Sequence, residues 1–148
     1  MINCTGLGSK QFVNDLNLHP VRGQVIRVKA SWIKYCITTD YDTSYILPLD
    51  DCVVLGGTQQ YDSYDLEVNE TDCQNILEKC CRLLPSLKYA QIVKKSTGLR
   101  PIRTNGIRLE LEYLYDMKVI HNYGHGGSGI TLCLGCANNV VELILNKI

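Results

Sequence analysis

A run of glycines joins the last predicted strand to the last predicted helix, and this unit constrains the fold more than any other feature. Residues 117–122 read as a short strand. Residues 130–148 read as the clearest helix, because apolar residues recur along one stripe: Leu134, Ala137, Val141, Leu145 and Ile148. Between them, residues 124–129 (GHGGSG) match the pattern G-x-G-x-x-G. The sequence therefore predicts a strand, a glycine loop and a helix that share one layer.

Three interpretations of the glycine loop were compared. A dinucleotide fingerprint needs a second strand after the helix and an acid about 20 residues on, whereas Glu142 lies inside the predicted helix. A plain glycine-rich turn stays open as the second interpretation. The third is an acceptor site, in which backbone N–H groups at the helix N-terminus face an electron-rich ring. Close approach of the backbone would explain Gly126, Gly127 and Gly129, so we favour this interpretation.

The rest of the chain predicts a mixed α+β and α/β fold. Short strands are expected at residues 1–4, 23–30, 37–39, 45–48, 52–56, 90–97 and 107–114, with a turn at 49–51 and a helix at 71–84. The middle strands suit an antiparallel sheet, and the first and last segments suit one α/β layer. A strand at residue 1 and a single strand–loop–helix unit do not complete such a layer. We therefore expect a further part of the fold before Met1.

Composition narrows the function classes. Lysine plus arginine equals aspartate plus glutamate at 15 each, which argues against a nucleic-acid or anionic-membrane partner. Apolar runs stay below the roughly 20 residues that span a bilayer, and the first residues lack a signal-peptide pattern. Eight cysteines are expected as reduced thiols of an intracellular protein. Cys133-x-x-Cys136, with His121 and His125 nearby, does not favour a metal or redox site because both cysteines fall inside the predicted helix.

One arginine and two tyrosines are candidates for carboxylate binding. Arg100 is expected at a strand end, followed by a turn that Pro101 stiffens. Its planar guanidinium suits a bidentate contact with a carboxylate. Tyr41 and Tyr45 lie four residues apart as the chain enters a strand. A surface salt bridge for the arginine and ring packing for the tyrosines stay open as alternatives.

The order of several motifs resembles the C-terminal part of the D-amino-acid oxidase family, which includes D-aspartate oxidase. These motifs are NCTG at 3–6, RGQ at 22–24, YILP at 45–48, LGG at 55–57, CCRLLPSL at 80–87, TGLRP at 97–101 and HNYGHGG at 121–127. The resemblance implies an FAD-binding α/β domain interleaved with an antiparallel substrate domain. It assigns residues 1–18 and 116–148 to the former and 19–115 to the latter. The N-terminal G-x-G-x-x-G half of the family is absent, and residues 124–129 match its second glycine loop, which approaches the flavin ring.

The resemblance also implies residue roles. Arg100 matches the arginine that clamps the substrate carboxylate, Tyr45 the tyrosine that joins the clamp and Tyr41 the lid tyrosine. The carbonyl of Gly126 would face the substrate amine. The residues implied near FAD are Thr5, Gly6, Gly126, Gly127, Gly129, Ile130 and Thr131.

The implied reaction is oxidation of a D-amino acid to an imino acid, which hydrolyses to a 2-oxo acid and ammonia, while dioxygen is reduced to hydrogen peroxide. It requires no acid or base residue from this chain. Gln59 and the spelling of the glycine loop favour neutral substrates over D-aspartate. D-aspartate oxidase, a glycine- or sarcosine-oxidase relative and a truncated inactive chain are the alternatives.

Without the other half, apolar residues such as Leu134, Val141 and Leu145 are expected to be exposed, and the 148 residues alone are expected neither to hold FAD tightly nor to turn over substrate. The final residues Asn146-Lys147-Ile148 are not the Ser-Lys-Leu address, so both peroxisome and cytoplasm remain expected locations. A homodimer is a further open expectation.

Overall fold

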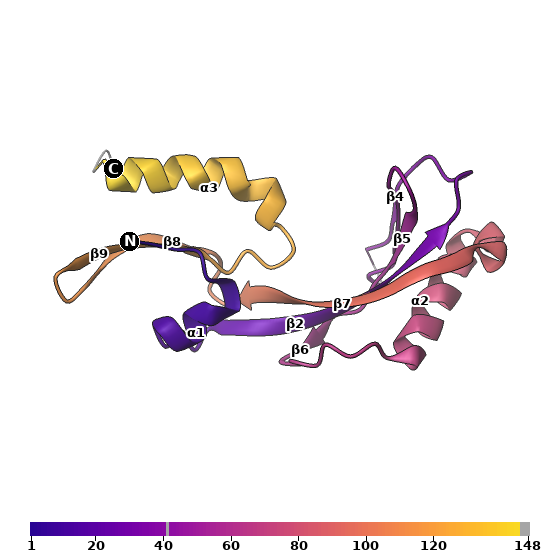
Figure 1. Ribbon diagram of the computed structural model, residues 1–148, viewed down its shortest axis with the longest axis horizontal. Coiled ribbons are helices and arrows are strands. Elements are labelled where there is room, and N and C mark those ends of the chain that lie inside the picture. The colour runs from indigo at the N-terminus through magenta and orange to yellow at the C-terminus, as the bar shows by residue number, and fades with distance from the viewer. Residues whose placement is uncertain (41, 146–148) are drawn as a thin grey trace. The chain divides into compact units, whose positions relative to one another are not determined.

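The computed structural model describes residues 1–40 and 42–145, which fall into two compact units. Unit 1 comprises Met1–Val21 and Arg100–Ile148, and unit 2 comprises Arg22–Leu99. The chain thus enters and leaves through unit 1, with unit 2 inserted between its two segments. Figure 1 gives the element labels used below.

Unit 1 is built on a three-stranded sheet in the order β1-β9-β8. Its strands are β1 (Ile2–Asn3), β8 (Arg108–Leu114) and β9 (Met117–Tyr123). β1 pairs with β9 in parallel, so that Asn3 lies beside His121, and β8 pairs with β9 antiparallel. A 3-10 helix, η1 (Gly6–Gly8), and the short helix α1 (Ser9–Phe12) follow β1. The long helix α3 (Gly129–Ile144) packs along β8 and β9 (Figure 1).

Unit 2 contains a sheet in the order β3-β4-β5-β2-β6, with β7 also paired to β2. The strands of this sheet are β2 (Leu18–Lys29), β3 (Ile37–Thr38), β4 (Tyr45–Pro48), β5 (Val53–Gly56), β6 (Gln60–Tyr61) and β7 (Gln91–Arg103). Residues 18–21 of β2 and 100–103 of β7 belong to unit 1. The pairs β2–β5, β3–β4 and β4–β5 are antiparallel. Helix α2 (Glu70–Leu83) and the 3-10 helix η2 (Pro85–Tyr89) complete the unit.

The core of unit 2 lies between its sheet and α2. The helix contributes the buried face Cys73, Ile76, Cys80 and Cys81, which is its i, i+3/i+4 pattern, and the strands contribute Ile26, Val28, Ile46, Val53 and Leu55. Burial raises the pKa of the Cys80 thiol to about 11, so Cys80 behaves as an apolar core residue. Asn69 caps the helix, because its side chain accepts a hydrogen bond from the backbone N–H of Asp72 at 3.0 Å.

The mixed α+β architecture with an antiparallel sheet confirms the predicted fold class. The turn at 49–51 is present, with the N–H of Leu49 donating to the carbonyl of Cys52 at 2.8 Å. The predicted end of a strand before Arg100 is wrong, since β7 continues through Pro101 to Arg103. The reason is pairing with segments distant in sequence, because β7 pairs with β2 and Ile102 also bridges to His125 in antiparallel fashion.

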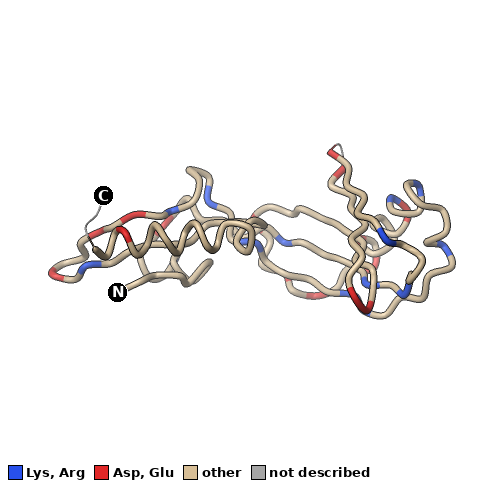
Figure 2. Tube along the Cα trace, turned by 90° about the horizontal axis from the view of Figure 1, so that it is seen from above, with Lys and Arg blue, Asp and Glu red and all other residues tan. Residues whose placement is uncertain are grey.

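Helix α3 begins one residue before its predicted start and ends at Ile144. Residues 146–148, with Ile148 of the predicted stripe, lie outside the described residues. The stripe does not face the sheet: Leu134 is 78% exposed, Val141 51% and Leu145 54%, whereas Cys136 and Val140 are buried. The expected exposure of Leu134, Val141 and Leu145 is therefore found. Glu142 is the one charged residue along the helix, which is tan over nearly its whole length in Figure 2.

The unit boundary also differs from the predicted division, because residues 100–115 group with the two ends of the chain. Their pairing explains this, since β8 forms a ladder with β9 along seven residue pairs. Among the described residues, helices long and apolar enough to cross a membrane are absent.

Candidate functional site

Two glycines in the loop of residues 124–129 have backbone conformations that residues with a side chain rarely adopt. Gly124 and Gly126 have φ angles of +87° and +58°. A Cβ on Gly124 would lie 2.9 Å from the Cβ of Arg103, and one on Gly126 would lie 3.0 Å from Cγ1 of Ile102. Both glycines are therefore needed for the close approach of the loop to β7.

Hydrogen bonds hold the loop against β7 and α3. The N–H of Gly126 donates to the carbonyl of Pro101 at 2.8 Å, and the N–H of Ser128 donates to the carbonyl of His125 at 3.0 Å. Nε2 of His125 lies 3.4 Å from Sγ of Cys136 in α3. The N–H of Gly126 thus has a partner within the protein.

The backbone N–H groups at the start of α3 have surroundings that differ from those of the Gly126 N–H. Gly129, Ile130 and Thr131 form the first turn, and Ser128 at the N-cap makes no side-chain hydrogen bond to it. The first turn contains no acidic residue, and the side chain of Ile130 is 92% exposed. These N–H groups and the helix dipole therefore present positive potential to an acceptor.

The other candidate site residues of unit 1 lie near Pro101. A Cβ on Gly6, which has a φ of +54°, would lie 3.9 Å from Cγ of Pro101. One on Gly127 would lie 3.9 Å from Cδ of the half-buried Arg100. The turn at Thr5–Gly6, the arginine and the glycine loop thus gather around Pro101, although they are far apart in the sequence.

Tyr45 belongs to unit 2, where its ring packs on two glycines. A Cβ on Gly56 would lie 2.1 Å from Cζ of Tyr45, and one on Gly57 would lie 3.1 Å from its hydroxyl oxygen. The pairing of β4 with β5 produces this contact, because Tyr45 and Gly56 are partners in the ladder. Ring packing, one of the two sequence interpretations of Tyr45, is present. Tyr41 lies outside the described residues.

The turn before Tyr45 is held by an aspartate. The carboxylate of Asp42 accepts from Oγ1 of Thr39 at 2.5 Å and from the N–H of Ser44 at 3.0 Å. The hydrogen bonds from Thr39 and Ser44 lower the pKa of Asp42 below its ordinary value. The neighbouring Thr43 has a φ of +60° and donates from Oγ1 to the carbonyl of Asp42 at 2.6 Å.

A hollow of about 400 Å³ in unit 2 contains a residue that sequence reasoning missed. Its lining includes Thr43, Gly57, Gln59, Asn75 and Lys79. Nζ of Lys79 donates to the backbone carbonyl of Asp42 at 3.3 Å. The spacing of Asn75 and Lys79, four residues apart on the helix, was the available signal that both line the same hollow.

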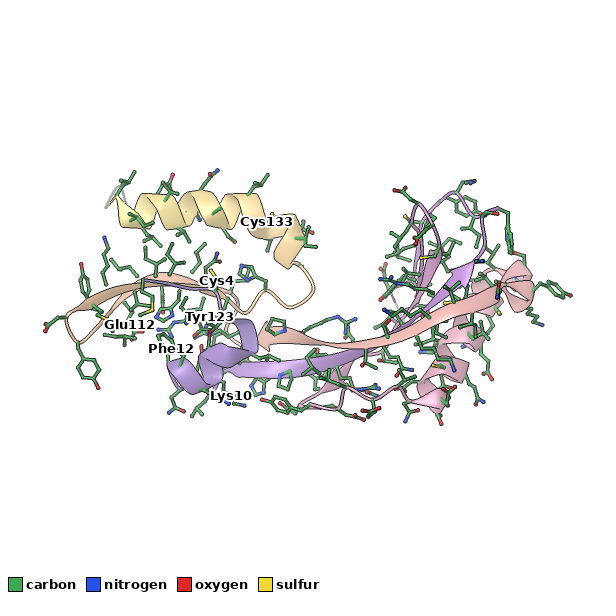
Figure 3. The ribbon with its side chains drawn as sticks, in the orientation of Figure 1. Cys4, Lys10, Phe12, Glu112, Tyr123 and Cys133 are labelled. Carbon is green, nitrogen blue, oxygen red and sulfur yellow. The ribbon has the colours of Figure 1, made fainter. Side chains whose placement is uncertain are left out.

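A buried polar network in unit 1 was also missed. It runs through hydrogen bonds from Asn3 to His121, Glu112, Arg108, Tyr123, Asp15 and Arg103. Glu112 and Tyr123 lie on the face of β8 and β9 that is turned away from α3 (Figure 3). Burial and the hydrogen bond to Asp15 raise the pKa of the Tyr123 phenol. Clusters of residues suited to a metal ion are absent from the described ranges.

The family comparison matches nearly the whole chain. Residues 1–143 match the model of the DAO family, described as FAD dependent oxidoreductase. The chain belongs to this family, whose cofactor is FAD, and the predicted resemblance is confirmed.

Curated relatives match 97% of the chain. It is 44% identical to a D-amino acid oxidase of Dugesia ryukyuensis and 39% identical to a D-aspartate oxidase of Homo sapiens. It covers 45% and 43% of those two proteins. The chain therefore spans less than half the length of the curated relatives it matches.

Solved structures share the fold at lower identity. A glycine oxidase from Bacillus cereus superposes with a TM-score of 0.86 at 23% identity, covering 99% of this chain and 42% of that one. An L-proline dehydrogenase from P. horikoshii gives a TM-score of 0.82 at 17% identity, with 99% and 42% covered. Both likenesses concern the fold alone.

Proposed function

We propose that the complete protein containing these 148 residues catalyses the FAD-dependent oxidation of D-amino acids to 2-oxo acids, with release of ammonia and hydrogen peroxide. The observation that carries the proposal is the gathering of three predicted site segments around Pro101: Thr5–Gly6, Arg100 and residues 126–129. Membership in the FAD-dependent family and the names of the relatives support it.

The start of α3 suits the electron-rich edge of a flavin. The N–H groups of Gly129, Ile130 and Thr131 lack a side-chain cap from Ser128, and a Cβ added to Gly127 would lie in van der Waals contact with Cδ of Arg100. Such donors stabilise negative charge on a reduced ring. Bound FAD would supply the hydride acceptor, and Thr5, Gly6 and Gly126 would contribute backbone contacts.

Arg100 and Tyr45 are the proposed carboxylate ligands, with Tyr41 as lid and the carbonyl of Gly126 toward the amine. A guanidinium fork and a phenol O–H are suitable donors for one carboxylate. Binding the carboxylate at one place and the amine at another fixes which enantiomer presents its Cα–H to the flavin. The protein then contributes orientation and electrostatics, and the cofactor contributes the redox chemistry.

Substituting Arg100 tests this proposal. A charge-assisted hydrogen bond contributes about 1.5–3 kcal/mol, so Arg100→Leu should lower kcat/KM for D-alanine by about 10- to 150-fold. Arg100→Lys should lose less, and FAD affinity should stay unchanged in both variants. Arg82→Leu, on the exposed side of α2, is the control. A wild-type kcat/KM in Arg100→Leu would remove Arg100 from the site.

A preference for acidic D-amino acids is the second candidate, because a cation lines the hollow next to Gly57. Lys79 shares that hollow with Gln59, the residue whose identity favours neutral substrates. If the second candidate holds, Lys79→Met lowers kcat/KM for D-aspartate and leaves D-alanine unaffected. Equal effects on both substrates would support the neutral preference, which we favour.

The remaining assignments are proposals of the same kind. We assign unit 1 to the FAD-binding part and unit 2 to the substrate-binding part, in place of boundaries at 18 and 115. Peroxisomal or cytoplasmic location and a homodimer stay predictions. Fractionation of cells and the mass of the purified protein in solution would test them.

A further inference from the structure

The orientation of one buried amide determines which ring nitrogen of His121 carries the hydrogen. The side chain of Asn3 is 2% exposed, and its Oδ1 lies 3.2 Å from the backbone N of Thr5 and 2.7 Å from Oγ1 of Thr5. A backbone N–H only donates, so the atom that faces it must be the amide oxygen. The NH₂ of Asn3 therefore points the other way, toward His121.

The hydrogen position on His121 follows from this orientation. Nδ2 of Asn3 lies 3.1 Å from Nδ1 of His121, and because an amide NH₂ only donates, Nδ1 must accept and carry no proton. Nε2 then carries the hydrogen and donates to Oε2 of Glu112 at 2.8 Å. His121 is fully buried, so water cannot replace either partner.

The groups around the imidazole favour this tautomer. Oε2 of Glu112 also accepts from Nη2 of Arg108 at 3.0 Å, which holds the carboxylate in place. Tyr123 packs edge-on against the imidazole with ring centroids 5.8 Å apart, and its hydroxyl donates to Asp15 at 2.6 Å. Glu112 of β8 and Tyr123 of β9 thus contact the imidazole directly, and Asp15 is linked to it only through Tyr123.

The same amide holds the turn that follows β1. Oδ1 of Asn3 accepts both hydrogen bonds from Thr5, and Oγ of Ser9 lies 3.2 Å away. If the amide rotated by 180°, its NH₂ would face the N–H of Thr5 and these bonds would be lost. His121 prevents that rotation because its unprotonated Nδ1 accepts from the NH₂ group only.

We propose that His121, as the neutral Nε2–H tautomer, is a positioning residue for the turn at Thr5–Gly6. It acts through Asn3 and touches neither substrate nor cofactor. The link to flavin binding rests on the proposed function, which assigns Thr5 and Gly6 to the cofactor. The positioning of the turn itself does not depend on that assignment.

The tautomer is tested by ¹⁵N NMR of the histidine side chains, with His121→Gln to assign the signal. We expect the shift of an unprotonated acceptor at Nδ1 and of a protonated nitrogen at Nε2. Asn3→Asp should place a hydrogen on Nδ1 of His121, because the new carboxylate oxygen can only accept. A proton on Nδ1 in the wild-type protein would overturn the inference.

The positioning role is tested on the complete protein that contains these residues, by hydrogen exchange at the Thr5 amide and by the Kd for FAD. We expect His121→Leu to speed exchange at Thr5 and to raise the Kd about tenfold. His121→Gln, which retains one acceptor and one donor, should keep the Kd within threefold. Val119→Ala is the matched control, because Val119 is fully buried in the same strand and does not contact Asn3 through a hydrogen bond.

The outcomes separate this inference from the proposed function. Unchanged Thr5 exchange in His121→Leu, or equal changes in Val119→Ala, would overturn the positioning role whether or not FAD binds. Faster exchange in His121→Leu alone, in a complete protein that binds no FAD, would support the positioning role and contradict the proposed function. A raised Kd with faster exchange supports both.

Discussion

At the scale of single residues, Arg22 shows how a buried charge can be satisfied by its surroundings. Its side chain is 2% exposed, yet the guanidinium donates to side-chain and backbone oxygens from several segments of unit 2: Gln24, Gln60, Asp65, Glu67 and Asp72. The arginine thereby fixes the segment between β6 and α2. Its role is structural, although it occurs in one of the family motifs.

Replacing Arg22 should lower the free energy of unfolding. Arg22→Met leaves Asp72 and the carbonyls without their donor, and we expect the free energy of unfolding to fall by about 3–5 kcal/mol. Arg82→Met, at an exposed site on α2, should change it by less than about 0.5 kcal/mol. Denaturant titration of both variants measures the difference. A loss below about 1 kcal/mol at Arg22 would show that the network is not a major source of stability.

A substitution of Gly56 gives the second prediction for a single residue. Because an added Cβ would lie 2.1 Å from the ring of Tyr45, Gly56→Ala forces the tyrosine to move. We expect a stability loss of about 1–3 kcal/mol and a raised KM for the D-amino acid. Gly98→Ala is the control for stability, since nothing lies within 4 Å of its added Cβ. Equal stability of the two variants would contradict the packing described for Tyr45.

At the scale of elements, the N-terminus of α2 tests whether local capping stabilises unit 2. Asn69→Ala removes the side-chain bond to the N–H of Asp72 and should lower the free energy of unfolding by about 1 kcal/mol. Gln74→Ala, at an exposed position of the same helix, should change it by only a few tenths of a kcal/mol. If the two variants unfold at the same denaturant concentration, the cap contributes nothing measurable.

Asp15 links the segment after α1 to β7 and β9, and its titration should be visible in the pH dependence of stability. Burial raises its pKa, but hydrogen bonds from Tyr123 and Arg103 outweigh burial and lower it. The carboxylate therefore stabilises unit 1 above the unfolded pKa of about 4, and this contribution is lost as pH falls through the lower folded pKa.

Asp15→Asn should flatten that acid-side decline. The free energy of unfolding of the wild-type protein should fall more steeply than that of the variant as the pH is lowered below about 4. Asp50→Asn, at an exposed turn, is the matched control and should follow the wild type. The same slope for Asp15→Asn as for wild type would mean that other carboxylates dominate.

Sequence periodicity predicted the bounds of the helices and strands better than it predicted which segments they pair with or pack against. Strand β4 occupies the predicted residues and α2 differs by one residue at each end, because their patterns and caps are local. The extension of β7 to Arg103 depends on pairing with β2 and with His125, and the buried face of α3 depends on packing against β8 and β9. Neither interaction is visible in a window of neighbouring residues.

At the scale of the whole molecule, the candidate site could be predicted only in part. The motifs identified the family and several segments of the site, and the structure brings Gly6, Arg100 and the glycine loop around Pro101. Lys79 and the network of His121 were missed, because their neighbours come from distant parts of the sequence. The roles of Tyr41 and Tyr45 remain predictions.

The most direct test of the proposed function is a peroxide assay on the complete protein that contains these residues, with FAD and matched D- and L-amino acids. We expect hydrogen peroxide and 2-oxo acid to form in equal amounts from D-alanine, with little product from L-alanine. D-aspartate in parallel separates the two substrate preferences. An FAD-loaded protein that oxidises neither D-amino acid would contradict the account.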